Sequence, residues 1–107
     1  MAASRIEIFE QMLAVDPDNT MVMFGLAKEY EKTGDEAKVI ETLERYLAAA
    51  DDEGNAYGML ARAFERTQQS DKAREAYQRG VEVAASHGHP GMAEEYKSIL
   101  EAEFSAP

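Results

Sequence analysis

Apolar residues recur along most of the chain at the spacing of an α-helix. In residues 20–33, Met23, Leu26, Ala27 and Tyr30 fall at positions i, i+3, i+4 and i+7, which form one stripe on a helix. The same stripe returns in residues 36–49 and 70–86. Ahead of the first stripe, Asn19 suits a helix N-cap, and the glycine at 34 suits the residue just past a helix end. We therefore predict an all-α fold with helices at about 3–15, 19–33, 36–50, 54–67, 70–86 and 90–104.

The pattern repeats with a period of 34 residues and no gap. Shifting the chain by this amount places Leu26-Ala27 and Tyr30 on Leu60-Ala61 and Phe64. Two positions align in three copies, namely Phe9, Leu43 and Tyr77, and Leu13, Leu47 and Val81. A period of this size indicates stacked helical repeats, in which each unit buries its apolar face against its neighbours.

On these residues the chain resembles the tetratricopeptide repeat family, whose unit pairs two antiparallel helices in about 34 residues. Met23 takes the tryptophan position of the family pattern, while Asp51 and Ala85 replace the boundary proline and Gln68-Gln69 replaces the usual turn glycine. The resemblance implies one domain, an α-solenoid of about six helices with right-handed superhelical stacking. Its parts would be a half repeat (4–19), two repeats (20–53 and 54–87) and a capping helix (88–104), the last of which matches the repeat poorly.

The amino-acid composition argues against several classes of function. The 21 acidic residues outnumber the 11 Lys and Arg residues, and a net charge of −10 should repel phosphate backbones, so we expect no nucleic-acid partner. The chain has no cysteine, no signal-peptide pattern and no run of about 20 apolar residues, so we expect a cytoplasmic protein with no membrane partner. His87 and His89 are too few to hold a metal. We expect no cofactor, no metal and no enzymatic activity.

One surface stripe stands out on the first helix of each repeat, opposite the core stripe. Lys28 and Lys32 recur as Arg62 and Arg66, and the resemblance implies that first helices line a concave groove where peptides bind. The predicted groove residues are Met21, Phe24, Lys28, Glu31, Lys32, Asn55, Gly58, Arg62, Glu65 and Arg66. The cations would bind carboxylates, Met21 and Phe24 would form an apolar anchor, and Gly58 would leave room for a ligand. Alternatively, the cations are ordinary solvated charges paired locally with Glu29, Glu31 and Glu65.

The leading interpretation is a protein–protein or peptide interaction module, an adaptor or assembly factor that binds a short polypeptide segment in this groove. The alternative is a self-associating scaffold. In that case the N-terminal helix, through Ile6 or Ile8, or the C-terminal tail Ser105-Ala106-Pro107 would contact another copy.

Overall fold

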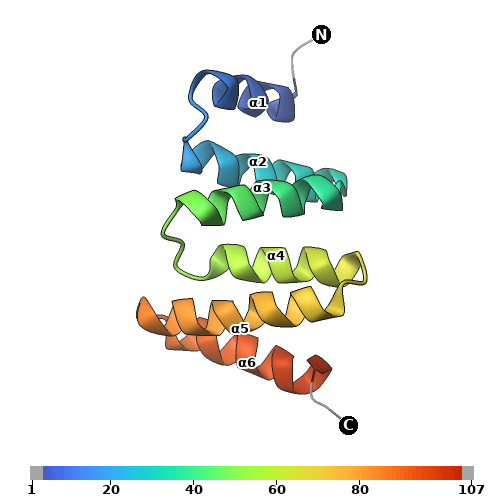
Figure 1. The fold of residues 1–107 in the computed structure, drawn as a ribbon, viewed down its shortest axis with the longest axis vertical. Coiled ribbons are helices and arrows are strands. Elements are labelled where there is room, and N and C mark those ends of the chain that lie inside the picture. Colours follow the sequence, from blue (N-terminus) through green and yellow to red (C-terminus); the bar gives the residue numbers. More distant parts are fainter. Residues whose placement is uncertain (1–3, 105–107) are drawn as a thin grey trace. The chain divides into compact units, whose positions relative to one another are not determined.

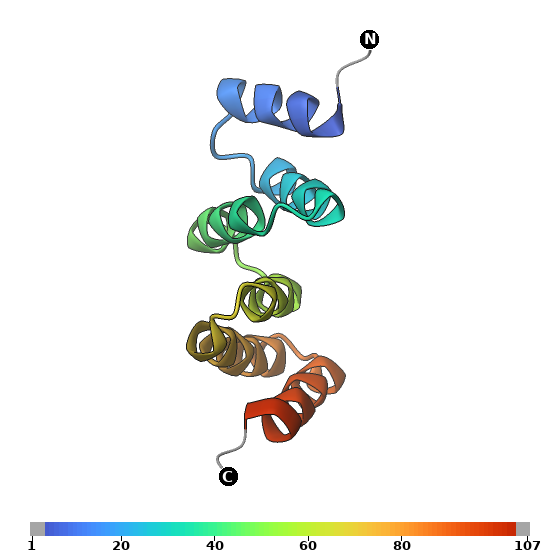
Figure 2. The same ribbon diagram turned by 90° about the vertical axis from the view of Figure 1, so that its right-hand side faces the viewer.

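The computed structural model describes residues 4–104, whose regular structure consists of six α-helices (Figures 1 and 2). They are α1 (Arg5–Val15), α2 (Thr20–Thr33), α3 (Glu36–Ala49), α4 (Asn55–Arg66), α5 (Ser70–Ser86) and α6 (Pro90–Phe104). The prediction of an all-α chain is confirmed, and every predicted helix end lies within two residues of the observed one. Within residues 4–104, none of the helices combines the length and the apolar composition of a membrane-spanning segment. The predicted contact through Ser105-Ala106-Pro107 concerns residues outside the described range.

The helix ends carry the caps that the sequence predicts. The Asn19 side chain accepts a hydrogen bond from the amide of Val22 at 3.2 Å, which satisfies a free donor in the first turn of α2. Gly34 ends this helix in the left-handed conformation, with φ of 78°. One repeat later the same position is Gln68, which also has a positive φ, of 61°. The lost turn glycine therefore leaves the backbone path unchanged and places a side chain in a conformation that glycine tolerates better.

The chain divides by its contacts into two compact units, Met1–Asp51 and Asp52–Pro107. In the first unit, α2 and α3 run antiparallel and α1 packs on α2 (Figure 1). The predicted stripes form its core, with Ala27, Val39 and Leu43 completely buried. Leu13 is the buried residue of α1.

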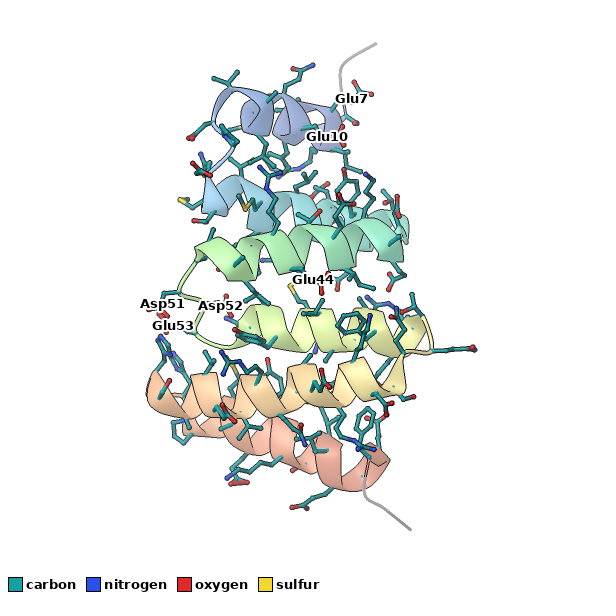
Figure 3. The ribbon with its side chains drawn as sticks, in the orientation of Figure 1. Glu7, Glu10, Glu44, Asp51, Asp52 and Glu53 are labelled. Atoms are coloured by element: carbon teal, nitrogen blue, oxygen red, sulfur yellow. The ribbon has the colours of Figure 1, made fainter. Side chains whose placement is uncertain are left out.

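One polar contact joins α1 to this core. The Tyr30 hydroxyl donates a hydrogen bond of 2.6 Å to Glu10, which extends from α1 toward α2 (Figure 3). Burial, together with this carboxylate, raises the pKa of Tyr30 to about 12, so the phenol stays protonated and remains a donor. At the tyrosine position of the repeat, the buried ring of Tyr30 therefore also has a polar partner, Glu10, for its hydroxyl group.

In the second unit, α4 and α5 are antiparallel and α6 packs on α5. Tyr96 of α6 is 4% exposed, lies 5.8 Å from the Tyr77 ring, and donates a hydrogen bond of 2.9 Å to the carbonyl of Gly54. Its ring also covers Gly58 and Gly80, the residues that allow α6 to approach closely. Tyr96 is therefore the residue through which α6 closes this unit.

The sequence of α6 follows the repeat after a shorter interval. Met92, Ala93 and Tyr96 have the same spacing as Leu60, Ala61 and Phe64, but they follow them after 32 residues instead of 34. Ala93 and Tyr96 are the buried residues of this helix, just as Ala61 and Phe64 are buried in α4. The helix thus has the pattern of a repeat's first helix, and the poor match at the full period reflects a shift of two residues.

Candidate binding faces on the first helices

The predicted stripe on α2 is a cation lying over an aromatic pair. The Lys28 ammonium group lies 4.8 Å from the centre of the Phe24 ring, and that ring lies 5.1 Å from the Tyr46 ring of α3. Met21, one turn earlier, is 85% exposed. The helical spacing of Met21, Phe24 and Lys28 thus brings an exposed apolar side chain, a half-buried ring and a cation onto one face.

The two lysines of this face have different surroundings. Lys32 pairs with Glu29 at 3.1 Å, and Arg5 approaches the same carboxylate at 3.5 Å. No carboxylate within residues 4–104 pairs with Lys28. The alternative interpretation, in which the cations pair locally with acidic residues, therefore applies to Lys32 and does not apply to Lys28. Glu31 of the same face is half-buried and already engaged by other groups.

On α4, Arg62 occupies the repeat position of Lys28 and likewise lacks a carboxylate partner among the described residues. Its side chain is exposed and close enough to Tyr77 and Tyr96 for its charge to oppose the burial that raises the pKa of both phenols. None of the described carboxylates forms an ion pair with it. Asn55 and Arg66 are exposed at the first and last residues of the same helix. Arg62 and Lys28 are therefore cations at equivalent repeat positions, and neither forms an ion pair with a described carboxylate.

The prediction that Gly58 leaves room for a ligand is wrong. A Cβ atom at this position would lie 2.5 Å from the Tyr96 hydroxyl oxygen and 2.9 Å from its Cζ atom. The space beside the glycine is filled by α6 of the same chain. Glycine is present here because two helices approach closely, and Gly58 cannot contribute to a binding surface.

Glu65 is engaged inside the second unit. The Tyr77 hydroxyl donates a hydrogen bond of 2.5 Å to it, and burial with this contact raises the pKa of the phenol well above its ordinary value. Repulsion from Glu65 in turn raises the pKa of the Glu103 carboxyl on α6. This carboxylate therefore links α4 to α5, and its proposed part in binding has to compete with the hydrogen bond from Tyr77.

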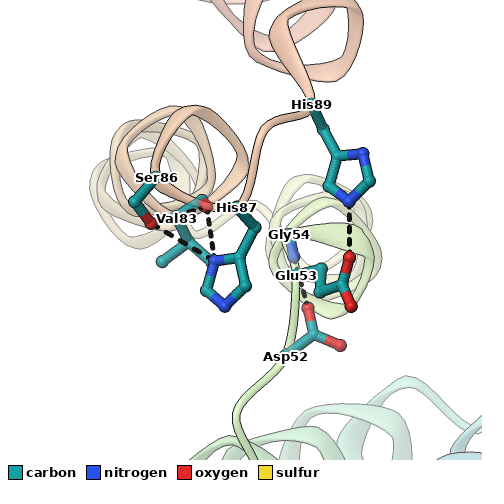
Figure 4. A network of polar contacts seen from close by, with 7 residues as sticks. All are labelled: Asp52, Glu53, Gly54, Val83, Ser86, His87 and His89. Carbon is teal, nitrogen blue, oxygen red and sulfur yellow. Dashed lines mark hydrogen bonds and ion pairs between the residues drawn. The ribbon is translucent and has the colours of Figure 1, made fainter.

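The two histidines contact groups near helix ends: His87 contacts the last turn of α5, and His89 contacts the segment before α4. His87 Nδ1 lies 2.9 Å from the carbonyl of Val83 at the end of α5, and His89 Nε2 lies 2.5 Å from Glu53 (Figure 4). Asp52, beside Glu53, accepts hydrogen bonds from the amides of Gly54 and Ala56 and so caps α4. The part of the chain that the structure describes contains no group of three or more His, Cys, Asp or Glu side chains placed to hold a metal ion.

A cavity of about 290 Å³ lies among α1, α2 and α3, and it contains none of the predicted groove residues. Leu13 and Leu26 contribute apolar walls, whereas Lys38, Glu41 and Arg45 contribute charges of both signs. Arg45 already donates to the carbonyl of Pro17 at 2.6 Å, and Lys38 lies 3.7 Å from Glu41. Its charged groups are thus largely satisfied within the unit, and the α2 and α4 faces remain the candidate binding surfaces.

Comparison of the sequence with known protein families supports the 34-residue helical repeat. A tetratricopeptide repeat family model matches residues 2–63, and a second model of the same description matches residues 54–87. The matches end before α6, where the interval is two residues shorter. A search of curated proteins finds no match.

Proposed function

Because the chain belongs to the tetratricopeptide repeat family, whose repeats mediate protein–protein interactions, we propose that it binds acidic polypeptide segments, through the exposed face of α2 in the first unit and the equivalent face of α4 in the second. The observation that carries this proposal is the state of Lys28 and Arg62. In a chain with 21 acidic residues, these two equivalent cations pair with no carboxylate of the described residues, and Lys28 also lies over the Phe24 ring.

The physical argument concerns what these cations can still bind. A carboxylate that reaches Lys28 or Arg62 does not have to displace an internal ion pair first, unlike one that approaches Lys32. Charge-assisted hydrogen bonds of this type contribute about 1.5–3 kcal/mol each when they form in partly desolvated sites. Met21 and Phe24 add an apolar surface beside Lys28, so the preferred ligand combines acidic residues with an apolar one.

The role follows from the chemistry of the surface. These groups bind and orient a ligand, and they include no nucleophile paired with a general base, which fits the non-catalytic role typical of the family. The protein would therefore act as an adaptor or assembly factor. It would bind an acidic segment of one protein while the rest of its surface contacts another protein.

A peptide-display selection tests the proposal without a known partner. The intact protein serves as bait, and random peptides that it retains are sequenced. We expect the selected peptides to be rich in Asp and Glu and to contain an apolar residue. Selected peptides are then synthesised with a fluorescent label, and their affinities are measured by anisotropy at increasing salt concentration.

Matched variants make the result specific. The Lys28→Glu/Arg62→Glu variant should bind the selected peptides at least about 10-fold more weakly, because each face loses a charge-assisted contact and gains a like charge. The control Lys38→Glu/Lys72→Glu reverses the same number of charges at positions that are also 34 residues apart, on α3 and α5. It should bind normally. Equal weakening of both variants, or selection of peptides without acidic residues, contradicts the assignment.

A further inference from the structure

Helix α1 is apolar on two sides, and the described residues cover only one of them. Leu13 is buried, and the Phe9 ring packs against Gly25 of α2. On the other side, Ile8 and Met12 are each 44% exposed and Val15 is 87% exposed. A helix that is apolar on both sides is normally buried on both sides.

Comparison within the repeat shows that this exposure is unusual for the position of Ile8. The equivalent residues on α3 and α5 are Thr42 and Ala76, which are 8% and 6% exposed. Both of those helices are packed in a helix pair, α3 with α2 and α5 with α4. The repeat position that is buried on α3 and α5 is exposed on α1, where it carries the larger side chain of Ile8.

We propose that the occupant of this face is α1 of a second copy, packed antiparallel. Arg5, Ile8, Met12 and Val15 are spaced by three, four and three residues, which is the seam of a two-helix contact. In an antiparallel pair, Ile8 lies opposite Met12 of the second copy, and the aliphatic part of Arg5 lies opposite Val15. The surface is self-complementary, as an interface with two-fold symmetry requires.

The charges on α1 favour the second copy as occupant. Arg5 lies at the start of α1 and Asp16 just past its end, so an antiparallel pair brings each Arg5, which also lies 3.5 Å from Glu29 and over the Phe9 ring of its own chain, near Asp16 of the second copy. On the opposite flank the seam is bordered by Ser4 and Gln11, which are uncharged. Two copies with a net charge of −10 can therefore meet here without placing like charges together.

The size of the face sets the strength of the contact. An 11-residue helix is only about 16 Å long, and a pair of such helices buries less surface than a standard stable interface of about 1,600 Å². The dimer should therefore be concentration-dependent and reversible. It is independent of the proposed peptide binding, since it uses neither the α2 face nor the α4 face.

Sedimentation equilibrium across a wide concentration range tests the proposal. The intact protein should show a monomer–dimer equilibrium, and Met12→Glu should raise its dissociation constant at least about 100-fold, because the dimer would bury two carboxylates in an apolar seam, each opposite Ile8 of the other copy. The control Met21→Glu changes another highly exposed methionine, on α2, and should leave the equilibrium unchanged. A protein that is monomeric throughout, or a Met12→Glu variant that dimerises normally, overturns the proposal.

Two further variants test the orientation. The chain has no cysteine, so an introduced one is unique. Under mild oxidation Gln11→Cys, near the centre of an antiparallel pair, should form a disulfide-linked dimer, whereas Val15→Cys should not, because the two copies of that residue lie at opposite ends. In addition, Arg5→Glu should weaken the dimer and the double variant Arg5→Glu/Asp16→Arg should restore it. The reverse cross-linking pattern, or no restoration, overturns the antiparallel arrangement.

Discussion

Replacing Gly58 by alanine tests whether α6 fills the space beside α4. The added methyl group would lie 2.5–3.0 Å from three atoms of Tyr96. The tyrosine cannot move away easily, because its hydroxyl is held by the carbonyl of Gly54 at 2.9 Å and its ring packs between Gly80 and Tyr77. Overpacking of this kind costs about 1–3 kcal/mol.

The net effect also includes a gain. Alanine is more favourable than glycine inside a helix by about 1 kcal/mol. Since the nearest contact is far inside van der Waals distance, the upper part of the overpacking range applies, and we expect Gly58→Ala to lower the free energy of unfolding by about 1–2 kcal/mol. Gly91→Ala, in α6, is the matched control, because nothing lies within 4 Å of its added methyl group. It should raise the free energy of unfolding by about 0.4–1 kcal/mol.

Urea unfolding followed by circular dichroism measures both variants, with unchanged m-values as the condition for comparing them. A double-mutant cycle with Tyr96→Phe then identifies the cause. Removing the hydroxyl eliminates the closest contact, so the penalty of Gly58→Ala should fall by at least about 0.5 kcal/mol in the Tyr96→Phe background. If Gly58→Ala stabilises the protein as Gly91→Ala does, the space beside Gly58 is open and the packing argument is wrong.

Two further predictions concern stability, one at a strained backbone position and one at a pair of like charges. Gln68→Gly should stabilise the protein by about 1 kcal/mol in urea unfolding, because Gln68 occupies the left-handed conformation that Gly34 occupies one repeat earlier; no gain would show that its side chain offsets the strain. Glu103→Gln should stabilise the protein at neutral pH, where Glu65 repels the Glu103 carboxylate. Because the pKa of Glu103 is raised in the folded state, the stabilising effect of its protonation is present below its unfolded pKa and is lost as pH rises through the folded value. The difference between variant and parent in urea unfolding should therefore shrink as the pH falls toward the unfolded carboxyl pKa of about 4.3, and a constant difference would contradict the repulsion.

The sequence predicts most of the fold because the repeat supplies the same local information twice. The stripe around Leu26 and the caps at Asn19 and Gly34 are determined by residues a few positions apart, and each was located correctly from spacing alone. The role of α6 was harder to predict, because its pattern is displaced by two residues from the repeat. A search for the Leu60-Ala61 pattern at intervals other than 34 would have found Met92-Ala93.

The environments of single side chains were less predictable, because they depend on partners far away in the sequence. Tyr96 meets Gly54, which is 42 positions away, and His89 meets Glu53, which is 36 positions away. The same limit explains the error at Gly58: helical geometry correctly places it on the stripe of Arg62, but only the packing of α6 shows that the space is occupied. Likewise, spacing alone could not distinguish Lys28 from Lys32, which differ by one ion pair.

The central claim, that the α2 and α4 faces bind an acidic segment, is tested most directly by mapping the contact on the protein. Amide resonances of the ¹⁵N-labelled chain are followed while an acidic peptide from the display selection is added. The account predicts that the largest shifts fall on residues of α2 and α4, centred on Lys28 and Arg62, and that they disappear in the Lys28→Glu/Arg62→Glu variant. Shifts centred on α3 and α5, or shifts that persist in that variant, would contradict it.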